Sequence, residues 1–156
     1  MWTGLIIGLL AGILAGILIA FFVSPSLMFR DDRYAGDFES ATRKLEAAVE
    51  KAGWKTPAVH DLQATMKKFD KDVRKVNVYA VCNPDHAYEI LSRDKERMVS
   101  NMMPCRIAVY EKKDGSVWIS RMNSGLMSRP MSPVIRRTMS AAAEDVEKII
   151  KEVLSD

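Results

Sequence analysis

The chain has 156 residues and a net charge of +3, and its first charged side chain is Arg30. The length beyond that point fits one domain, and two cysteines are too few for a disulfide scaffold. There is no run of lysine or arginine, and the few aromatic residues are not interleaved with basic ones, which argues against nucleic-acid binding.

Residues 1–23 predict a membrane anchor. Residues 2–23 carry no charged side chain and are long enough to cross a bilayer as one helix. A cleaved signal peptide would begin with basic residues and have a shorter apolar core, and Ala20-Phe21-Phe22 is a poor cleavage site. We therefore expect a retained, single-pass transmembrane helix in contact with membrane lipid.

A row of small residues recurs at every fourth position of this anchor: Gly4, Gly8, Gly12, Gly16 and Ala20. Such a row, a glycine zipper, lets two helices pack closely, although small residues are also common in membrane helices generally. We expect this face to pack against a second copy of the chain, giving a homodimer, or against other transmembrane subunits.

The basic residues that follow the anchor set its expected orientation. Arg30, Arg33, Arg43 and Lys44 come after it, and no charged side chain precedes it. The positive-inside rule then predicts a soluble domain on the cytoplasmic side of the inner membrane.

Residues 24–36 are expected to form a linker and a first strand, and residues 37–156 an α+β soluble domain. Asp37 is suited to cap a helix over 38–52 with one apolar stripe. Residues 54–62 predict a short strand, which Pro57 places at a sheet edge.

A second strand is predicted over residues 76–82, where Val76, Val78, Ala80 and Cys82 share one face. The next helix begins with a favourable cap, because Asn83 precedes Pro84 and Asp85.

Residues 105–111 and 117–122 alternate as two strands joined at Asp114-Gly115, which is a hairpin signal. Ser132-Pro133 opens the last helix. This order of elements predicts an α+β fold: a small antiparallel or mixed sheet packed with helices, preceded by the N-terminal transmembrane helix.

Cys82 and Cys105 are the first candidates for chemistry. Cys82 ends a strand at the start of a helix, where the helix dipole can lower a thiol pKa. If their two strands pair antiparallel, the sulfurs become neighbours. The competing interpretation is that both are small buried apolar residues, because each falls in the apolar phase of its strand.

His86 and the methionines, Met103 among them, extend this set. Thiol, imidazole and thioether groups suit copper(I), zinc or haem iron, so haem or copper is a candidate cofactor. Methionines more often fill gaps in cores and interfaces. No Cys-x-x-Cys pair indicates structural zinc.

His60-Asp61 is a further candidate, as an imidazole oriented by a carboxylate. No nucleophile can be assigned to it, and no set of nucleophile, base and orienting group can be assembled from the spacing. The residues therefore do not indicate an enzyme.

Several motifs together resemble the domain of unknown function 302, over about residues 37–154: Gly53-Trp54, His60-Asp61-Leu62, Cys82-Asn83-Pro84, Pro104-Cys105-Arg106 and Val109-Tyr110-Glu111. Residues 119–127 resemble the branch of that family with an N-terminal membrane span. The resemblance implies a compact α+β domain that is often dimeric, with no established reaction.

Two hypotheses follow. The chain is a membrane-tethered module that binds a metal or haem, or acts through a thiol pair, at a site built from Cys82, His86, Cys105, Met103 and His60. Alternatively, it is a non-catalytic accessory or assembly subunit of a larger membrane complex, docked through its glycine-rich helix.

Overall fold

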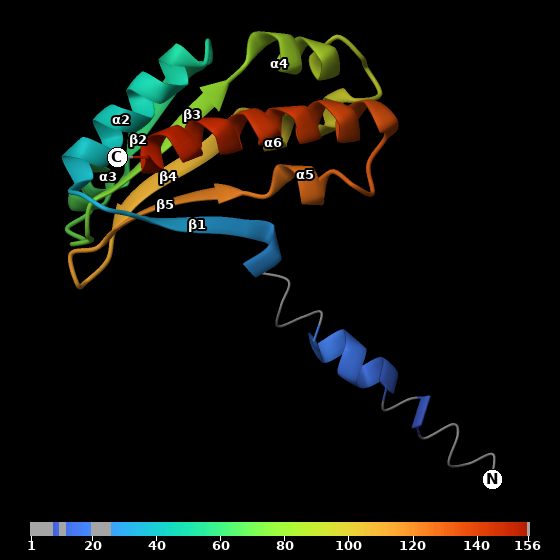
Figure 1. The fold of residues 1–156 in the computed structure, drawn as a ribbon, viewed down its shortest axis with the longest axis horizontal. Helices are drawn as coiled ribbons and strands as arrows, with labels where there is room; N and C mark the ends of the chain where they lie inside the picture. Colours follow the sequence, from blue (N-terminus) through green and yellow to red (C-terminus); the bar gives the residue numbers. More distant parts are fainter. Residues whose placement is uncertain (1–7, 10–11, 20–25, 156) are drawn as a thin grey trace.

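The computed structural model describes residues 8–9, 12–19 and 26–155, and from Phe29 onward the chain forms an α+β domain (Figure 1). Its centre is a five-stranded antiparallel sheet in the order β1-β5-β4-β3-β2. The strands are β1 (Phe29–Tyr34), β2 (Lys55–Asp61), β3 (Val76–Cys82), β4 (Cys105–Glu111) and β5 (Val117–Met122). The predicted α+β class is confirmed, and β1 lies within the stretch expected to hold a first strand.

Two long helices cover one face of this sheet (Figure 1). The helices are α2 (Phe38–Lys51), α3 (Leu62–Lys67), α4 (Pro84–Leu91), the 3-10 helix η1 (Arg97–Met102), α5 (Ser124–Met127) and α6 (Pro133–Leu154). Buried side chains of α2, of the C-terminal half of α6 and of the covered sheet face form the main core. Leu45, Ile107 and Ile119 at its centre are fully buried.

The helix starts follow from local capping, as the sequence predicts. The Asp37 carboxylate accepts a hydrogen bond from the backbone N–H of Ser40. The Asn83 side chain caps α4, and the Ser132 hydroxyl accepts from the backbone N–H of Ile135 at the start of α6. Each side chain satisfies a donor that the first helical turn leaves unpaired.

The sequence-based assignment of the buried face of β3 needs a correction. Tyr79 and Val81 face the helices and belong to the main core, whereas Cys82 lies in the opposite phase of the strand. The alternation of apolar residues along β3 could not show which face the helices cover, because Ala80, on the uncovered face, is also buried. For β4 the expected phase is confirmed, since Ile107 and Val109 are both fully buried.

The predicted transmembrane helix falls mainly on residues outside the described ones, and these include Gly4 and Ala20. The described part, residues 8–9 and 12–19, is helical and exposed. Within the part of the chain that the structure describes, no helix is both long enough and apolar enough to cross a membrane.

Candidate functional site

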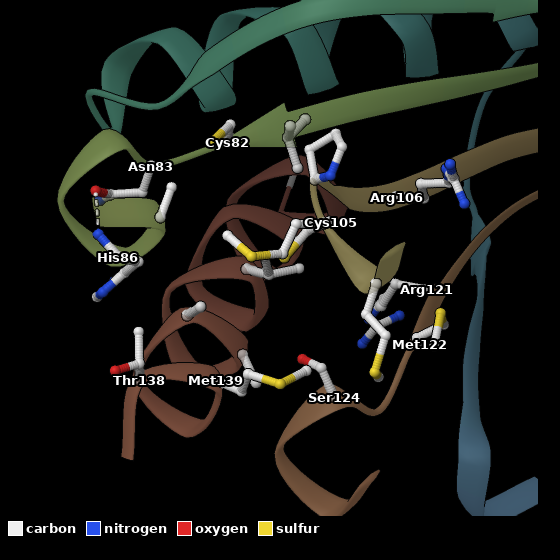
Figure 2. A pocket seen from close by; sticks show the side chains of 18 of the residues that line it. Cys82, Asn83, His86, Cys105, Arg106, Arg121, Met122, Ser124, Thr138 and Met139 are labelled. Atoms are coloured by element: carbon white, nitrogen blue, oxygen red, sulfur yellow. Dashed lines mark hydrogen bonds between the residues drawn. The ribbon is translucent and has the colours of Figure 1, made fainter. Parts of the chain in front are cut away.

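A cavity of about 290 Å³ lies at one end of the sheet, beyond the main core. Its walls come from α4, η1 and α6 and from the places where β3 ends, β4 begins and β5 ends (Figure 2). Antiparallel pairing explains this convergence, because the end of β3 and the start of β4 meet at the same sheet end: Val81 lies opposite Cys105.

His86 is held in the cavity wall by the cap of α4. The Asn83 side chain accepts from the backbone N–H of Asp85 at 2.9 Å. It also accepts from the backbone N–H of His86 at 3.3 Å (Figure 2). The His86 imidazole Nε2 lies 3.1 Å from Asp145 Oδ2 on α6, and its ring meets the buried Trp54 edge-on at 6.0 Å between centroids. Imidazole and carboxylate thus join α4 to α6.

Sulfur is the dominant chemical feature of the lining. The side chains that carry it are Cys82, Cys105, Met102, Met103, Met122 and Met139. Met139 is buried together with Ile90, Val99 and Ile135 in a second, smaller core cluster, and Met102 and Met103 pack against it. We call these six residues the methionine cluster. Methionine side chains are apolar, polarisable and flexible, so this wall can adjust to the shape of whatever packs against it.

The two thiols are free and half-buried. Burial raises the pKa of the Cys82 thiol. The pKa of Cys105 is also raised, mainly by burial and to a smaller extent by the charge of the nearby Cys82. Desolvation of the thiolate therefore outweighs the lowering that the dipole of α4 could give, which agrees with the competing interpretation of both cysteines as small buried apolar residues.

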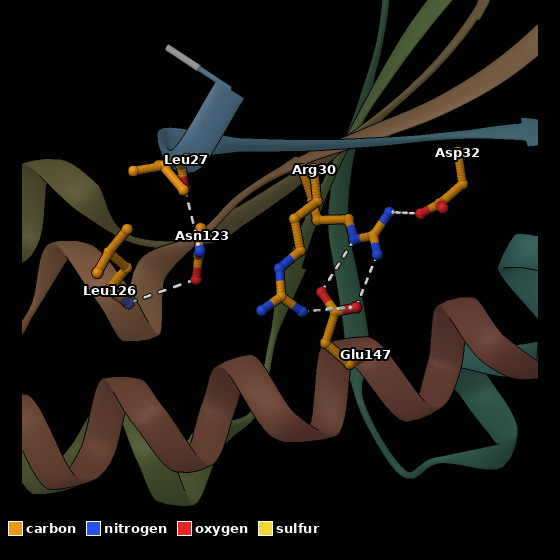
Figure 3. A network of polar contacts seen from close by, with 7 residues as sticks. Leu27, Arg30, Asp32, Asn123, Leu126 and Glu147 are labelled. Atoms are coloured by element: carbon orange, nitrogen blue, oxygen red, sulfur yellow. Dashed lines mark hydrogen bonds and ion pairs between the residues drawn. The ribbon is translucent and has the colours of Figure 1, made fainter. Parts of the chain in front are cut away.

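A charged network forms the wall next to β5 (Figure 3). The buried Arg121 donates from Nε and Nη2 to the two carboxylate oxygens of Glu147, at 3.0 and 2.6 Å, and from Nη1 to Asp32. Arg30 pairs with the same Glu147 at 3.0 Å. Burial opposes the charge on Arg121, but its hydrogen bonds to Glu147 and Asp32 outweigh that cost and raise its pKa.

The pKa of Glu147 is shifted in the opposite direction, downward. Burial alone would raise its pKa, but the hydrogen bond and charge of Arg121, and then those of Arg30, lower it. Arg121 and Glu147 therefore stabilise each other's charged forms, and their contacts fix α6 against β5 and β1.

The structure gathers four of the five predicted site residues around the cavity: Cys82, His86, Met103 and Cys105. His60 is separate from them. It lies exposed on the edge strand β2, opposite Val78, and does not line the cavity.

Arg121 and Glu147 line the cavity but were not among the predicted site residues. A signal was present, because Arg121 continues the buried phase of Val117 and Ile119, and an arginine there requires an acidic partner. The identity of that partner depends on tertiary packing, which the sequence does not reveal.

The cofactor expectation gains no support from the side chains that the structure describes. Among them, no group of three or more histidine, cysteine, aspartate or glutamate residues lies close enough to hold a metal ion. The site is an apolar, sulfur-rich cavity with ionised groups along one wall.

Comparison with known proteins identifies the family but no activity. Residues 32–156 match the family described as domain of unknown function DUF302. No curated protein matches. A solved structure titled "Crystal structure of uncharacterized conserved protein DUF302 from Bacillus stearothermophilus" superposes with a TM-score of 0.73 at 15% identity. The superposition covers 81% of this chain and 98% of that one.

At this identity the structural likeness shows the fold alone. The family match begins at residue 32, so it gives no support to the membrane-anchored branch. It spans β3, α4 and β4, where the cysteine motifs that suggested the family lie. This chain belongs to the family of the domain of unknown function DUF302.

Proposed function

We propose that the protein is a membrane-tethered binding module, whose ligand is a small and largely apolar molecule held in the sulfur-lined cavity. The observation that carries this proposal is the cavity of about 290 Å³ itself. Ligand sites are typically apolar concavities of ~300–1,000 Å³ with a few fixed polar groups, and the volume of this cavity is close to the lower limit of that range.

A packing defect is a poor explanation for such a cavity. Protein interiors are close-packed, and voids larger than a water molecule are few. Met102, Met103 and Met139 have flexible side chains that could fill the space, yet they surround it. The polar groups on the wall are held by partners, His86 by Asp145 and Arg121 by Glu147, so they are preorganised to orient a ligand.

Binding also fits the cavity better than thiol chemistry does. A nucleophilic cysteine requires a thiolate, and burial raises the pKa of both Cys82 and Cys105. The thiols therefore serve as apolar wall. For the candidate metal function, no group of three or more His, Cys, Asp or Glu residues that could hold an ion lies among the described residues.

The proposed tether is residues 2–23. Support comes from the absence of charge in that stretch and from its described helical residues, whose large apolar side chains are exposed: Leu9, Ile13, Leu14, Ile17, Leu18 and Ile19. An exposed apolar surface of this kind requires a cover, which lipid supplies. The basic residues after it favour a cytoplasmic domain.

Methionine-methyl NMR of the full chain in detergent micelles tests the proposed binding. Benzene serves as a small apolar probe, as it does for engineered apolar cavities. We expect benzene to shift the methyl signals of Met103 and Met139, while Met98, which is 79% exposed, serves as an internal control. No selective shift of the cavity methionines would refute the proposal.

A matched pair of variants on α6 sharpens this test. Ala142 lines the cavity, and its neighbour Ala141 does not. Ala142→Leu fills the space and should abolish the benzene shifts, whereas Ala141→Leu should retain them. If the two variants showed the same benzene-induced shifts, benzene would bind outside this cavity.

A second candidate function is that of an accessory subunit docked through its glycine face. The specific observation is open space at Gly8, Gly12 and Gly16, where an added Cβ would meet no atom within 4 Å. Small residues at this spacing let another helix approach closely. Co-purification in mild detergent tests it: Gly8→Leu with Gly12→Leu should release the partner, and unchanged association would refute it.

A further inference from the structure

The buried guanidinium of Arg121 has more donors than its protein partners use. An arginine side chain carries five N–H donors. Nε and Nη2 each donate once to Glu147, and Nη1 donates once to Asp32. Among the residues that the structure describes, Arg121 forms no further side-chain hydrogen bond, so one N–H on Nη1 and one on Nη2 lack a protein acceptor.

These two donors belong to a side chain on the cavity side of the sheet. Arg121 follows the phase of Val117 and Ile119 along β5, which places it on the face that α6 covers. Its side chain is 6% exposed and lines the cavity (Figure 2). Buried donors in proteins nearly always have an acceptor, so we expect an oxygen atom inside the cavity to supply it.

A hydroxyl group lies on the same side of the cavity. Ser124, at the start of α5, lines the cavity, and Figure 2 shows its hydroxyl pointing inward. Within the described part of the chain, this hydroxyl forms no hydrogen bond. A carbonyl oxygen has two lone pairs. One guanidinium N–H and one hydroxyl on the same wall therefore fit a single carbonyl oxygen.

The charges of this wall are balanced. Arg121 and Arg30 carry two positive charges, and both pair with Glu147. Glu147 and Asp32 carry two negative charges. A ligand carboxylate would lose its hydration without meeting a cation that lacks a partner. A ligand donor would compete with two guanidinium groups for Glu147, so a neutral acceptor fits this wall best.

We propose that the ligand is a neutral molecule with a carbonyl group on a compact apolar body, and that Arg121 and Ser124 bind the carbonyl oxygen. This inference rests on the proposed function. The apolar body lies against the methionines of the lining, which adjust to its shape. Glu147 and Asp32 hold the guanidinium in place before the ligand binds, so little ordering is required.

Three probes of similar shape test the proposal by methionine-methyl NMR of the full chain in detergent micelles. Acetophenone carries a carbonyl, α-methylstyrene has a methylene group in place of its oxygen, and benzoate is an anion. After correction for partition into the micelles, acetophenone should bind about tenfold more tightly than α-methylstyrene, because it accepts hydrogen bonds from a charged donor. Benzoate should bind most weakly. Equal affinities of the first two probes, or tightest binding of benzoate, would overturn the proposal.

A matched pair of serine variants on either side of the sheet tests the hydroxyl. Ser124→Ala should lower the affinity for acetophenone by about threefold and leave that for α-methylstyrene unchanged. Ser120→Ala is the control, because Ser120 lies in the opposite phase of β5 and does not line the cavity. Parent affinity for acetophenone in both variants would overturn the assignment of Ser124.

A double variant tests the guanidinium. Arg121→Met with Glu147→Leu removes Arg121 together with its buried partner, so no buried carboxylate is left unpaired. The folded double variant, verified by its methionine-methyl spectrum, should bind acetophenone and α-methylstyrene equally. A retained preference for acetophenone would overturn the role of Arg121.

The benzene titration separates this inference from the proposed function. Benzene shifts without a preference for acetophenone refute only the carbonyl ligand. Absence of benzene shifts refutes the cavity site, and this inference with it.

Discussion

The two halves of α6 have different neighbours. Toward the C-terminal end, Ile149, Ile150 and Val153 are buried in the main core against α2 and the sheet. In the N-terminal half, Ile135 and Met139 belong to the methionine cluster, and Met139 and Thr138 border the cavity. One continuous helix therefore connects a close-packed region with one that encloses space.

This difference separates stability from binding. Branched aliphatic side chains have few rotamers and fill the main core, whereas methionines adapt to the shape of a ligand. The comparison predicts that substitutions in the C-terminal half reduce the free energy of unfolding most, while those in the N-terminal half chiefly affect binding.

The largest effect is expected for a truncation in the main core. Ile150→Ala should lower the free energy of unfolding by about 3 kcal/mol, because it opens a void that the packed surroundings cannot close. Met139→Ala should cost about half of that, since one side of Met139 already faces a cavity. Denaturant unfolding measures both, and equal losses would contradict the proposed difference between the halves.

The next largest effect is expected at the boundary between the two regions, where Arg121 joins β5 to α6. Arg121→Met should cost about 2 kcal/mol, because Glu147 is left without its main partner while still partly buried. Adding Glu147→Leu should recover part of the loss. Lys51→Met removes an exposed pair with Glu152 and should change stability very little.

A smaller effect follows from pH. The folded pKa of Glu147 is lowered, so its contribution to stability is present above its unfolded pKa, about 4.3, and is lost as pH falls through the folded value. Glu147→Gln should therefore lose less stability on acidification than the parent, as followed by unfolding at stepwise lower pH. Glu144→Gln, at an exposed position of the same helix, should follow the parent curve.

Much of the fold could be predicted because its signals are local. Asp37, Asn83 and Ser132 cap the helices as expected, and Asp114-Gly115 joins the paired strands β4 and β5. The position of Cys82 near Cys105 also followed from strand order.

The remaining features depend on contacts between distant residues. Arg121 finds Glu147 only when β5 packs against α6, and the pKa of Cys82 depends on how deeply the strand end is covered. His60 was included from its neighbour Asp61 alone, and the edge position of β2 keeps it away from the cavity. No local pattern encodes these outcomes.

The smallest effect is expected in thiol labelling. Because burial raises the pKa of both Cys82 and Cys105, nearly all of each thiol is protonated at neutral pH, and the thiolate is the species that reacts. The folded chain should therefore react with a maleimide only slowly, and the rate should rise with pH beyond the range where an ordinary cysteine titrates. The urea-unfolded chain is the control and should react faster. Rapid labelling of folded Cys82→Ser or Cys105→Ser at neutral pH would show an activated thiol at the remaining cysteine, and the cavity would then be a reactive site rather than an apolar wall.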